Sequence, residues 1–388
     1  MSAIPEKYWL FTKVFSKKAS HRLPTHRPWD HAIDLIPGKT MKNSGIYHLT
    51  PSKSTALKEY ITEHLQKGYI HPLSLSMASP FFFIDKKDGK LWPVQDYCKL
   101  NEITVKNVAP LPLIPDLVNK LQGARYFTKL DVHWGYNNIR IKKGDEYKAT
   151  FKTALSLYKP LIMTFGLCNV PVTFQTFMNS IFKDLLDTGQ VVIYLDDILI
   201  FTHTINQLNR LTHKVLEHLE RHNLFLKPEK CFFDQKGIKY LGVIISEGQV
   251  KMDPAKVHGI LNWPTSKTLK NVQAFLGFCN FYCCFVQDFS AIVHPLSQLT
   301  KKDTPFVWGD AQEKGFRALI TAFTTAPVLP DHMKPFRLIT DASTFATGTI
   351  LEQPDVFNRW HPIAYYSKSL QPAEQNYEIH DLELLAII

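Results

Sequence analysis

The chain has 388 residues, of which 45% are hydrophobic and 12% aromatic, so it can form cores for two or three domains and is not generally disordered. Its formal net charge of +10 favours a polyanionic partner such as a nucleic acid, although a basic surface that only maintains solubility fits the charge equally well. The six cysteines fit neither a zinc site nor the disulfide framework of a secreted protein. No apolar run reaches the roughly 18 residues of a membrane span. We therefore expect an intracellular protein, cytoplasmic or nuclear, that is neither secreted nor inserted in a membrane.

The N-terminal part combines an arm, a helix and a hairpin. Residues 1–52 are rich in Pro, His and Lys with little periodicity, which predicts an extended arm lying on a larger body. A helix should follow, with Ser54 or Thr55 as its N-cap and Gly68 as its stop. Two strands come next, in SPFFFIDKKDGKLWPV, joined by an Asp-Gly dipeptide that suits a tight hairpin turn.

Two adjacent aspartates, Asp196 and Asp197, interrupt the apolar stretch VVIYLDDILIF, where an ionised carboxylate without a partner would cost several kcal/mol. The stretch predicts strand, Asp-Asp turn, strand, and Asp131 ends an earlier β-rich run, so three carboxylates can converge on one sheet. Divalent metal ions would compensate this charge, because Mg²⁺ takes carboxylate and phosphate oxygens and two such ions support an in-line phosphoryl transfer. The alternative is a polar hairpin turn without chemistry.

The second half of the chain is predicted to pass from helices to strands. A helix ends near Asn223, and KYLGVIIS is a single strand. Asp253, which precedes a proline, and Ser266 are helix-start signals, and the apolar helical stretch VQAFLGFCNFYCCFVQDF follows them. Strands return from about Phe336, in FRLITDAS, ATGTILEQ and HPIAYYSKSL, before a final helix over Tyr377–Ile388.

The order of these motifs resembles the reverse transcriptase of gypsy-type long-terminal-repeat retrotransposons. The resemblance covers nearly the whole chain, through FTKLD, MTFGLCNVPVTFQ, YLDDILIF, LKPEKC, YLG, DPAKV, VQAFLGFCNFY, TDAS and NYEIHDLELLAI. It implies an α+β fold, a right-hand polymerase with fingers, palm and thumb, followed by a connection and a truncated RNase H-like domain. The implied boundaries are an N-terminal arm after a protease junction over 1–52, fingers and palm over 53–250, thumb and connection helices over 251–332, and the truncated RNase H-like domain over 333–388.

The same resemblance assigns roles to individual residues. Asp131, Asp196 and Asp197 are implied to be the catalytic, metal-binding residues of an RNA-directed DNA polymerase with two Mg²⁺ ions, Mn²⁺ being the alternative. The implied partners are an RNA or DNA template with its primer and deoxynucleoside triphosphates, and a dimer is compatible with the resemblance. The other implied site residues are Lys86, Tyr136, Phe165 and Gly166 at the nucleotide, Gln175, Leu241 and Gly242 at the template and primer, and Asp341 and Glu383 in an RNase H remnant. On the sequence alone, Tyr136 could equally be a core aromatic residue and Lys86 a solvated hairpin tip.

The chain departs from the family where arginine is usual, with Trp92 and Cys98 in KLWPVQDYCKLN. Neither side chain can replace the five fixed donors with which arginine grips a triphosphate or supports the template region. In the family, arginine is also usual at His71, His133, Cys283 and Cys284, glycine at Ser156, an acidic residue at Lys159, and alanine or serine at Val170 and Val172. Every arginine loss, and the changes Gly to Ser, Glu to Lys and Ala to Val, can arise from one G·C to A·T transition. We therefore hypothesise a genomic copy eroded by cytosine deamination, with ordinary family variation as the alternative.

Two functions follow as expectations. The first is a reverse transcriptase of impaired activity, and the second is a catalytically decayed remnant that still binds nucleic acid. Metal-dependent primer extension separates them. A hydrolase acting through Asp341 and Glu383 is disfavoured, because two carboxylates are too few for a two-metal site, and ribonuclease H cleavage is expected to be absent.

Overall fold

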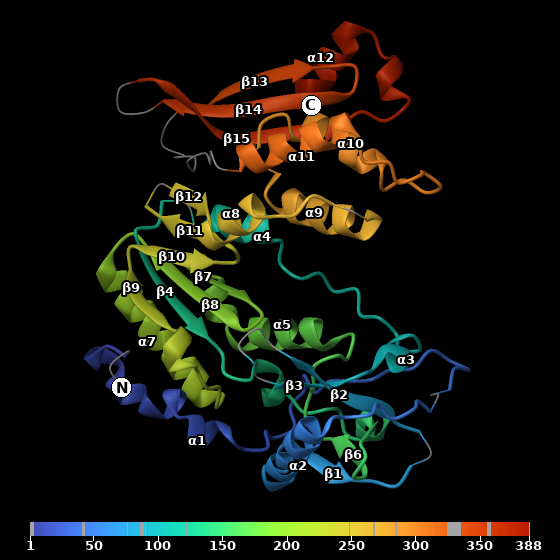
Figure 1. Cartoon of the computed structure of the whole chain (residues 1–388). Helices are drawn as coiled ribbons and strands as arrows, with labels where there is room; N and C mark the ends of the chain where they lie inside the picture. The colour runs from blue at the N-terminus through green and yellow to red at the C-terminus, as the bar shows by residue number, and fades with distance from the viewer. Residues whose placement is uncertain are drawn as a thin grey trace. The chain divides into compact units, whose positions relative to one another are not determined.

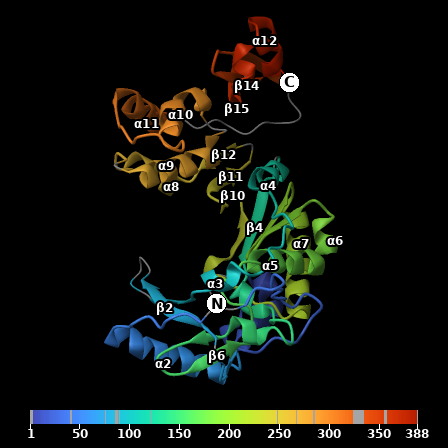
Figure 2. The ribbon, with the colours of Figure 1, turned by 90° about the vertical axis from the view of Figure 1, so that its right-hand side faces the viewer.

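The chain folds into two compact units, one formed by residues 1–117 and 127–235 and the other by residues 118–126 and 236–388. Both are drawn in Figure 1 and, turned by 90°, in Figure 2. The computed structural model describes residues 4–40, 43–75, 77–85, 89, 91–121, 123–247, 249–266, 268–283, 286–323, 335–354 and 358–387. Within these ranges, no helix is both long and apolar enough to cross a membrane.

The N-terminal arm begins with helical turns rather than extended chain. It contains the 3₁₀ helix η1 (Glu6–Phe15) and α1 (Lys17–Ser20). Tyr8, Phe11 and Val14 are buried, and the rings of Tyr8 and Phe11 lie 5.4 Å from His213 of α7 (Ile205–Arg221). The predicted extended arm is therefore wrong for residues 6–15 and 17–20. Apolar side chains three apart bury one face of a helix with three residues per turn.

A five-stranded sheet of order β1-β6-β5-β2-β3 forms one part of the first unit. Leu57 and Ile61 of the covering helix α2 join a core cluster with Phe81 and Phe151 of the sheet. The antiparallel pair β2 and β3 is the predicted hairpin, but residues 86–88 and 90 at its tip lie outside the described residues. The elements are α2 (Pro51–Gln66), β1 (Ile70–Pro72), β2 (Ser79–Asp85), β3 (Leu91–Gln95), α3 (Cys98–Asn101), η3 (Glu146–Ala149), β5 (Phe151–Lys152) and β6 (Leu157–Pro160).

The start of α2 differs from the prediction and its end does not. Thr50 is the N-cap, and its hydroxyl accepts a backbone N–H of the first turn. Pro51 fits the first helical position because it has no N–H that would need a partner there. Ser54 and Thr55 therefore lie inside the helix, whereas Gly68 follows its end with φ +68°, as expected of a stop signal.

A second sheet of the first unit, of order β7-β8-β4-β9, contains the predicted Asp-Asp hairpin. β7 and β8 pair antiparallel, and the residues from Ile198 to Ile200 are fully buried. Helices α5, α6 and α7 contact these two strands, which explains why β8 is a continuous apolar run instead of an alternating one. The elements are β4 (Tyr126–Asp131), η2 (Gly135–Asn138), α5 (Val170–Ile181), α6 (Lys183–Leu186), β7 (Val191–Tyr194), β8 (Asp197–Thr202), η4 (Pro228–Lys230) and β9 (Phe232–Gln235).

The segment KYLGVIIS forms a turn between two strands, so its prediction as one strand is wrong. β10 (Gly237–Tyr240), β11 (Val243–Ser246) and β12 (Gln249–Met252) make a three-stranded antiparallel sheet in the second unit. Leu241 and Gly242 have φ values of +47° and +90°, which lie outside the range of a strand. Glycine at the second of these positions tolerates the reversal.

Helices follow in the second unit, and one predicted start is displaced. Asp253 caps α8 as expected, but Thr268 caps the next helix, so Ser266 is buried outside it. The apolar stretch after it breaks into two helices, and Asp288, with φ +53°, stands directly before the second. The elements are α8 (Pro254–Leu261), α9 (Leu269–Phe281), α10 (Phe289–Gln298) and α11 (Asp310–Ala322). The short helix α4 (Ile114–Lys120) has residues 114–117 in the first unit and 118–120 in the second.

The C-terminal segment confirms the predicted strands and final helix. β13 (Arg337–Ala342), β14 (Ala346–Pro354) and β15 (Trp360–Ser369) form an antiparallel meander. After η6 (Glu374–Asn376), the helix α12 (Ile379–Ile387) packs on β13 and β14.

Candidate functional site

Three aspartates meet at one edge of the second sheet of the first unit. Asp131 ends β4, while Asp196 lies in the β7–β8 turn and Asp197 begins β8. The backbone N–H of Val132 donates to the carbonyl of Asp196 at 2.8 Å, which holds the end of β4 beside the turn. Strands 60 residues apart in the sequence thus bring their carboxylates together, as the pattern predicted.

Gln175 holds the turn that carries Asp196. Its side chain is buried on α5, and its oxygen accepts the N–H of Leu195 at 2.8 Å while its amide donates to the carbonyl of Ile193 at 3.1 Å. Leu195 needs this support because its φ is +52°, a costly value for a branched side chain. The observed contacts of Gln175 are therefore with the turn, and its contact with a template stays a prediction.

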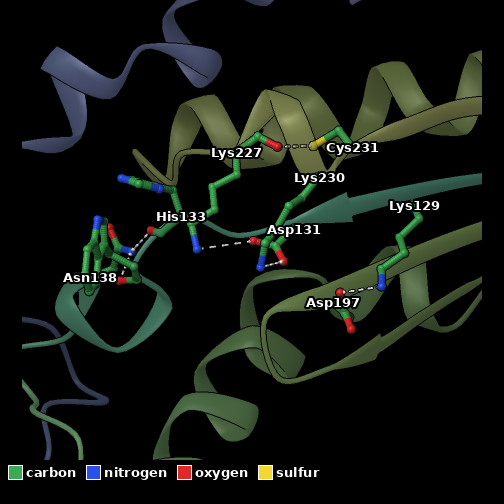
Figure 3. Close-up of polar contacts among 9 residues, drawn as sticks. Lys129, Asp131, His133, Asn138, Asp197, Lys227, Lys230 and Cys231 are labelled. Atoms are coloured by element: carbon green, nitrogen blue, oxygen red, sulfur yellow. Dashed lines mark hydrogen bonds and ion pairs between the residues drawn. The ribbon is translucent and has the colours of Figure 1, made fainter. Parts of the chain in front are cut away.

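Lysines compensate two of the carboxylates, as Figure 3 shows. Lys129 Nζ lies 3.0 Å from Asp197 Oδ1, and Lys230 Nζ lies 3.3 Å from Asp131 Oδ2. Lys227 Nζ is 3.7 Å from Asp131 Oδ1. All three lysines belong to β4 or to the segment just before β9, so the sheet topology places positive charge around the carboxylates.

Asp196 is the carboxylate for which the structure gives no ion pair with a lysine among the described residues. Burial, and then the negative charge of Asp131, raise the pKa of Asp196 to about 6. Burial also raises the pKa of Asp197, against the lowering effect of Lys129. Among the described residues, Asp196 Oδ1 is a buried atom without a hydrogen-bond partner, and so is Asp131 Oδ1. Buried oxygens of this kind are costly unless a cation or a donor meets them.

The donor set fits divalent cations. Carboxylate oxygens are the ligands that Mg²⁺ prefers, and Asp131 and Asp196 each have a buried oxygen that accepts no hydrogen bond. As the side chains stand, however, the described part of the chain contains no group of three His, Cys, Asp or Glu residues arranged as a ready metal cluster. Cation binding would therefore require Asp131 to release Lys227 and Lys230.

Gly135 sets the position of the Asp196 side chain, and the sequence analysis missed it. A Cβ at residue 135 would lie 2.0 Å from Asp196 Oδ1 and 2.8 Å from Phe174 Cζ. Only glycine leaves room for both groups. A glycine four residues after Asp131 was the available signal, but a close approach of this kind can be recognised only in three dimensions.

Two of the predicted nucleotide contacts lie beside Asp196. The rings of Tyr136 and Phe165 are 4.9 Å apart, and burial together with the charge of Asp196 raises the pKa of Tyr136 to about 12. Gly166 has φ +98°, and its carbonyl accepts the side-chain amide of Asn101 at 2.7 Å. The predicted triphosphate ligand Lys86 lies outside the described residues.

Tryptophans occupy the region next to these aromatic residues. The Trp92 ring lies 5.3 Å from Phe165 and 6.0 Å from Trp134, and the two indoles are nearly parallel at 12°. Trp134 is a second residue that the sequence analysis missed, since nothing local distinguishes it from a core aromatic. Cys98, at the other departure from the family, is exposed and donates its N–H to Asp96 at 3.1 Å.

The remaining predicted residues belong to the second unit. Leu241 and Gly242 form the β10–β11 turn, where the Tyr282 hydroxyl donates to the Gly242 carbonyl at 3.1 Å. Asp341 on β13 lines a cavity of about 640 Å³, and Glu383 on α12 is exposed and not part of its lining. The structure therefore does not bring Asp341 and Glu383 into one cavity.

Comparison with known proteins agrees with this arrangement. Residues 84–245 match the family model of the reverse transcriptase (RNA-dependent DNA polymerase), and residues 308–388 match that of the RNase H-like domain found in reverse transcriptase. The Tf2-3 and Tf2-4 transposon polyproteins of Schizosaccharomyces pombe are 33% identical over 99% of this chain. The chain spans 29% of the length of each.

Solved structures show the same fold. The foamy viral protease-reverse transcriptase in complex with dsDNA aligns over 98% of this chain and 79% of its own, with a TM-score of 0.83 and 20% identity. Its dRH form aligns over 70% of its own length with a TM-score of 0.82 and the same identity. The expected α+β polymerase fold with an RNase H-like part is confirmed. Residues 84–245 therefore belong to the reverse transcriptase family and residues 308–388 to the RNase H-like family, and the expected resemblance to the Pol protein of a long-terminal-repeat retrotransposon is confirmed.

Proposed function

We propose that this chain is an RNA-directed DNA polymerase that extends a primer with deoxynucleotides, and that Asp131 and Asp196 hold two divalent ions with Asp197 in support. The observation that carries the proposal is the pair of buried oxygens of Asp131 and Asp196 at one sheet edge that accept no hydrogen bond. When bound, the two ions would activate the primer 3′-hydroxyl and neutralise the leaving pyrophosphate. Mg²⁺ suits the all-oxygen donor set, and Mn²⁺ is the alternative.

The surrounding residues have complementary tasks in this proposal. Tyr136 and Phe165 form the wall against which the sugar and base of the incoming nucleotide lie. The positive φ of Gly166 lets the backbone approach that nucleotide closely. Lys227 and Lys230 form ion pairs with Asp131 and so balance its negative charge before cations arrive.

Template and primer are the proposed macromolecular partners. Related structures, those of the foamy viral enzyme, were determined with dsDNA and with an RNA/DNA hybrid. The net charge of +10 supports binding of the same class of ligand here. Leu241 and Gly242 at the β10–β11 turn are the proposed primer contacts, and Lys86 is the proposed triphosphate contact.

A second candidate is a nucleic-acid-binding protein with little turnover, and one observation favours it. Trp92 packs edge-on against Phe165 beside the proposed nucleotide wall, where the family usually has arginine. An indole offers neither charge nor a bidentate fork to a triphosphate. Impaired nucleotide binding is therefore part of this proposal.

Primer extension on a homopolymer template, with Mg²⁺ and Mn²⁺ tried separately, tests the proposal. Asp196→Asn should abolish extension, because it removes the charge that would hold the cation. Asp187→Asn is a matched control, since Asp187 is exposed at the end of α6 in the same unit. Extension that survives in Asp196→Asn would refute the assigned site, and loss in both variants would show an effect unrelated to it.

A further inference from the structure

A small cavity with aromatic walls adjoins the proposed nucleotide wall in the first unit and shares Phe165 with it. Its volume is about 240 Å³, below the roughly 300–1,000 Å³ of pockets that take drug-sized molecules. Three of its walls are the rings of Trp92, Trp134 and Phe165. The space therefore suits one planar ring system and not an extended ligand.

The aromatic walls are held in place. Trp134 has the left-handed backbone values φ 50° and ψ 48°, which are unfavourable for a bulky side chain. The Asn138 amide fixes this backbone by donating to the carbonyls of His133, Trp134 and Gly135 at 3.0–3.3 Å. Even so, 42% of Trp134 is exposed. A strained backbone that keeps a large apolar ring in solvent is typical of a ligand platform.

The polar groups of the cavity suit an uncharged ligand. Lys67 is the lysine in the lining, and it is already paired with Glu63. His64 and His21 also line the cavity, and burial lowers the pKa of His64 to about 4 and lowers that of His21 as well, so both are neutral at neutral pH. Lys227, which lies 5.9 Å from the Trp134 ring, is paired with Asp131, so the lysines at this cavity already have acidic partners.

Two amides remain to meet the edge of a planar heterocycle. The Asn137 side chain makes no hydrogen bond within the part of the chain that the structure describes. Gln95 also lines the cavity, and its amide donates to the Tyr60 hydroxyl at 3.2 Å. Amides supply both a donor and an acceptor, which is what the edges of nucleobases require.

We infer that this cavity binds one unpaired nucleobase of a single nucleic-acid strand, stacked on the exposed part of Trp134, with Trp92 as the neighbouring wall. Stacking on aromatic side chains is the usual way in which single strands are held, and every base has a face that permits it. The choice of a nucleobase rests on the proposed function, but the binding needs neither metal nor nucleotide addition. Because the family usually has arginine at residue 92, the second indole is a feature of this chain.

The experiment measures binding of labelled single-stranded oligonucleotides to the full chain in EDTA. One strand carries bases, and a second strand of the same length is abasic throughout, so both present the same phosphates. Trp134→Asn is the test variant, since asparagine tolerates the left-handed backbone and removes only the ring. Trp9→Ala is the matched control, because Trp9 is also exposed in the first unit but lies outside the cavity.

Trp134→Asn should weaken binding of the base-carrying strand about tenfold and leave the abasic strand unchanged. Trp92→Ala should act in the same direction, and Trp9→Ala should have no effect. Equal loss on both strands, or no loss on either, would overturn the inference. Stronger binding of free adenosine than of the strand would overturn the assignment to a strand. Because EDTA removes metal ions, primer extension cannot occur in this binding assay. Its outcome therefore tests the base-binding cavity independently of the proposed polymerase activity.

Discussion

Gly135→Ala should disable the proposed catalytic centre without unfolding the chain. The added Cβ would lie 2.0 Å from Asp196 Oδ1, 3.0 Å from Asp196 Cγ and 2.8 Å from Phe174 Cζ. Contacts this short cannot persist, so the carboxylate must move by about 1 Å or more. A displacement of about 1 Å in a reacting geometry can cost roughly a hundredfold in rate, or about 2.7 kcal/mol. We expect kcat/KM for deoxynucleotides to fall by about that factor.

The assay is steady-state primer extension, with thermal unfolding measured in parallel. Overpacking at this site should cost about 1–3 kcal/mol of stability, so the variant remains folded. Gly45→Ala is the control, because a Cβ at Gly45 meets no atom within 4 Å and it belongs to the same unit. If Gly135→Ala extends primers as well as the parent does, then the position of the Asp196 carboxylate does not matter for catalysis and the assigned site is wrong.

Three further predictions follow from other parts of the first unit. The double variant Trp92→Arg with Cys98→Arg should raise kcat/KM for deoxynucleotides at least about tenfold in the same extension assay. The reason is that each charge-assisted hydrogen bond is worth about 1.5–3 kcal/mol. If the variant shows no gain, the catalytic defect lies at other residues. Gln175→Met should lower the melting temperature by several degrees, because it leaves the N–H of Leu195 without its acceptor at a cost of about 1–3 kcal/mol. An unchanged melting curve would contradict the role of Gln175 in the turn. His31 has a pKa lowered by burial from 6.5 to about 4, so the unfolded chain binds the extra proton and stability is lost as the pH falls from 6.5 to 4. His31→Gln should therefore reduce the difference in unfolding free energy between pH 7 and pH 4, measured in urea, by up to about 3 kcal/mol, and an unchanged difference would show that His31 does not titrate in this way.

Much of the secondary structure and the cluster of three carboxylates could be predicted from local patterns. The apolar run around Asp196 and Asp197 predicts two buried strands with a turn, because a strand covered on both faces needs no polar alternation. The strands and helix after Phe336 follow from the same kind of periodicity. Two predictions of element boundaries were wrong. The start of α2 lies at Thr50 and Pro51 instead of at Ser54 or Thr55, and the positive φ of Gly242 divides KYLGVIIS into two strands.

Only the tertiary structure decided which side chains meet. Lys230 and Asp131 are 99 residues apart, and they form an ion pair because β9 lies next to β4 in the sheet. Residue 135 must be glycine because a Cβ there would lie 2.0 Å from Asp196 Oδ1. Trp92 contacts Trp134 because β3 lies beside the loop after β4. Periodicity records which face of an element is buried, and it carries no information about the partner across the fold. The sequence by itself therefore determined the carboxylates and the class of polymerase, while the positions of the compensating charges, the glycine contact and the aromatic cavity depended on sheet order and packing.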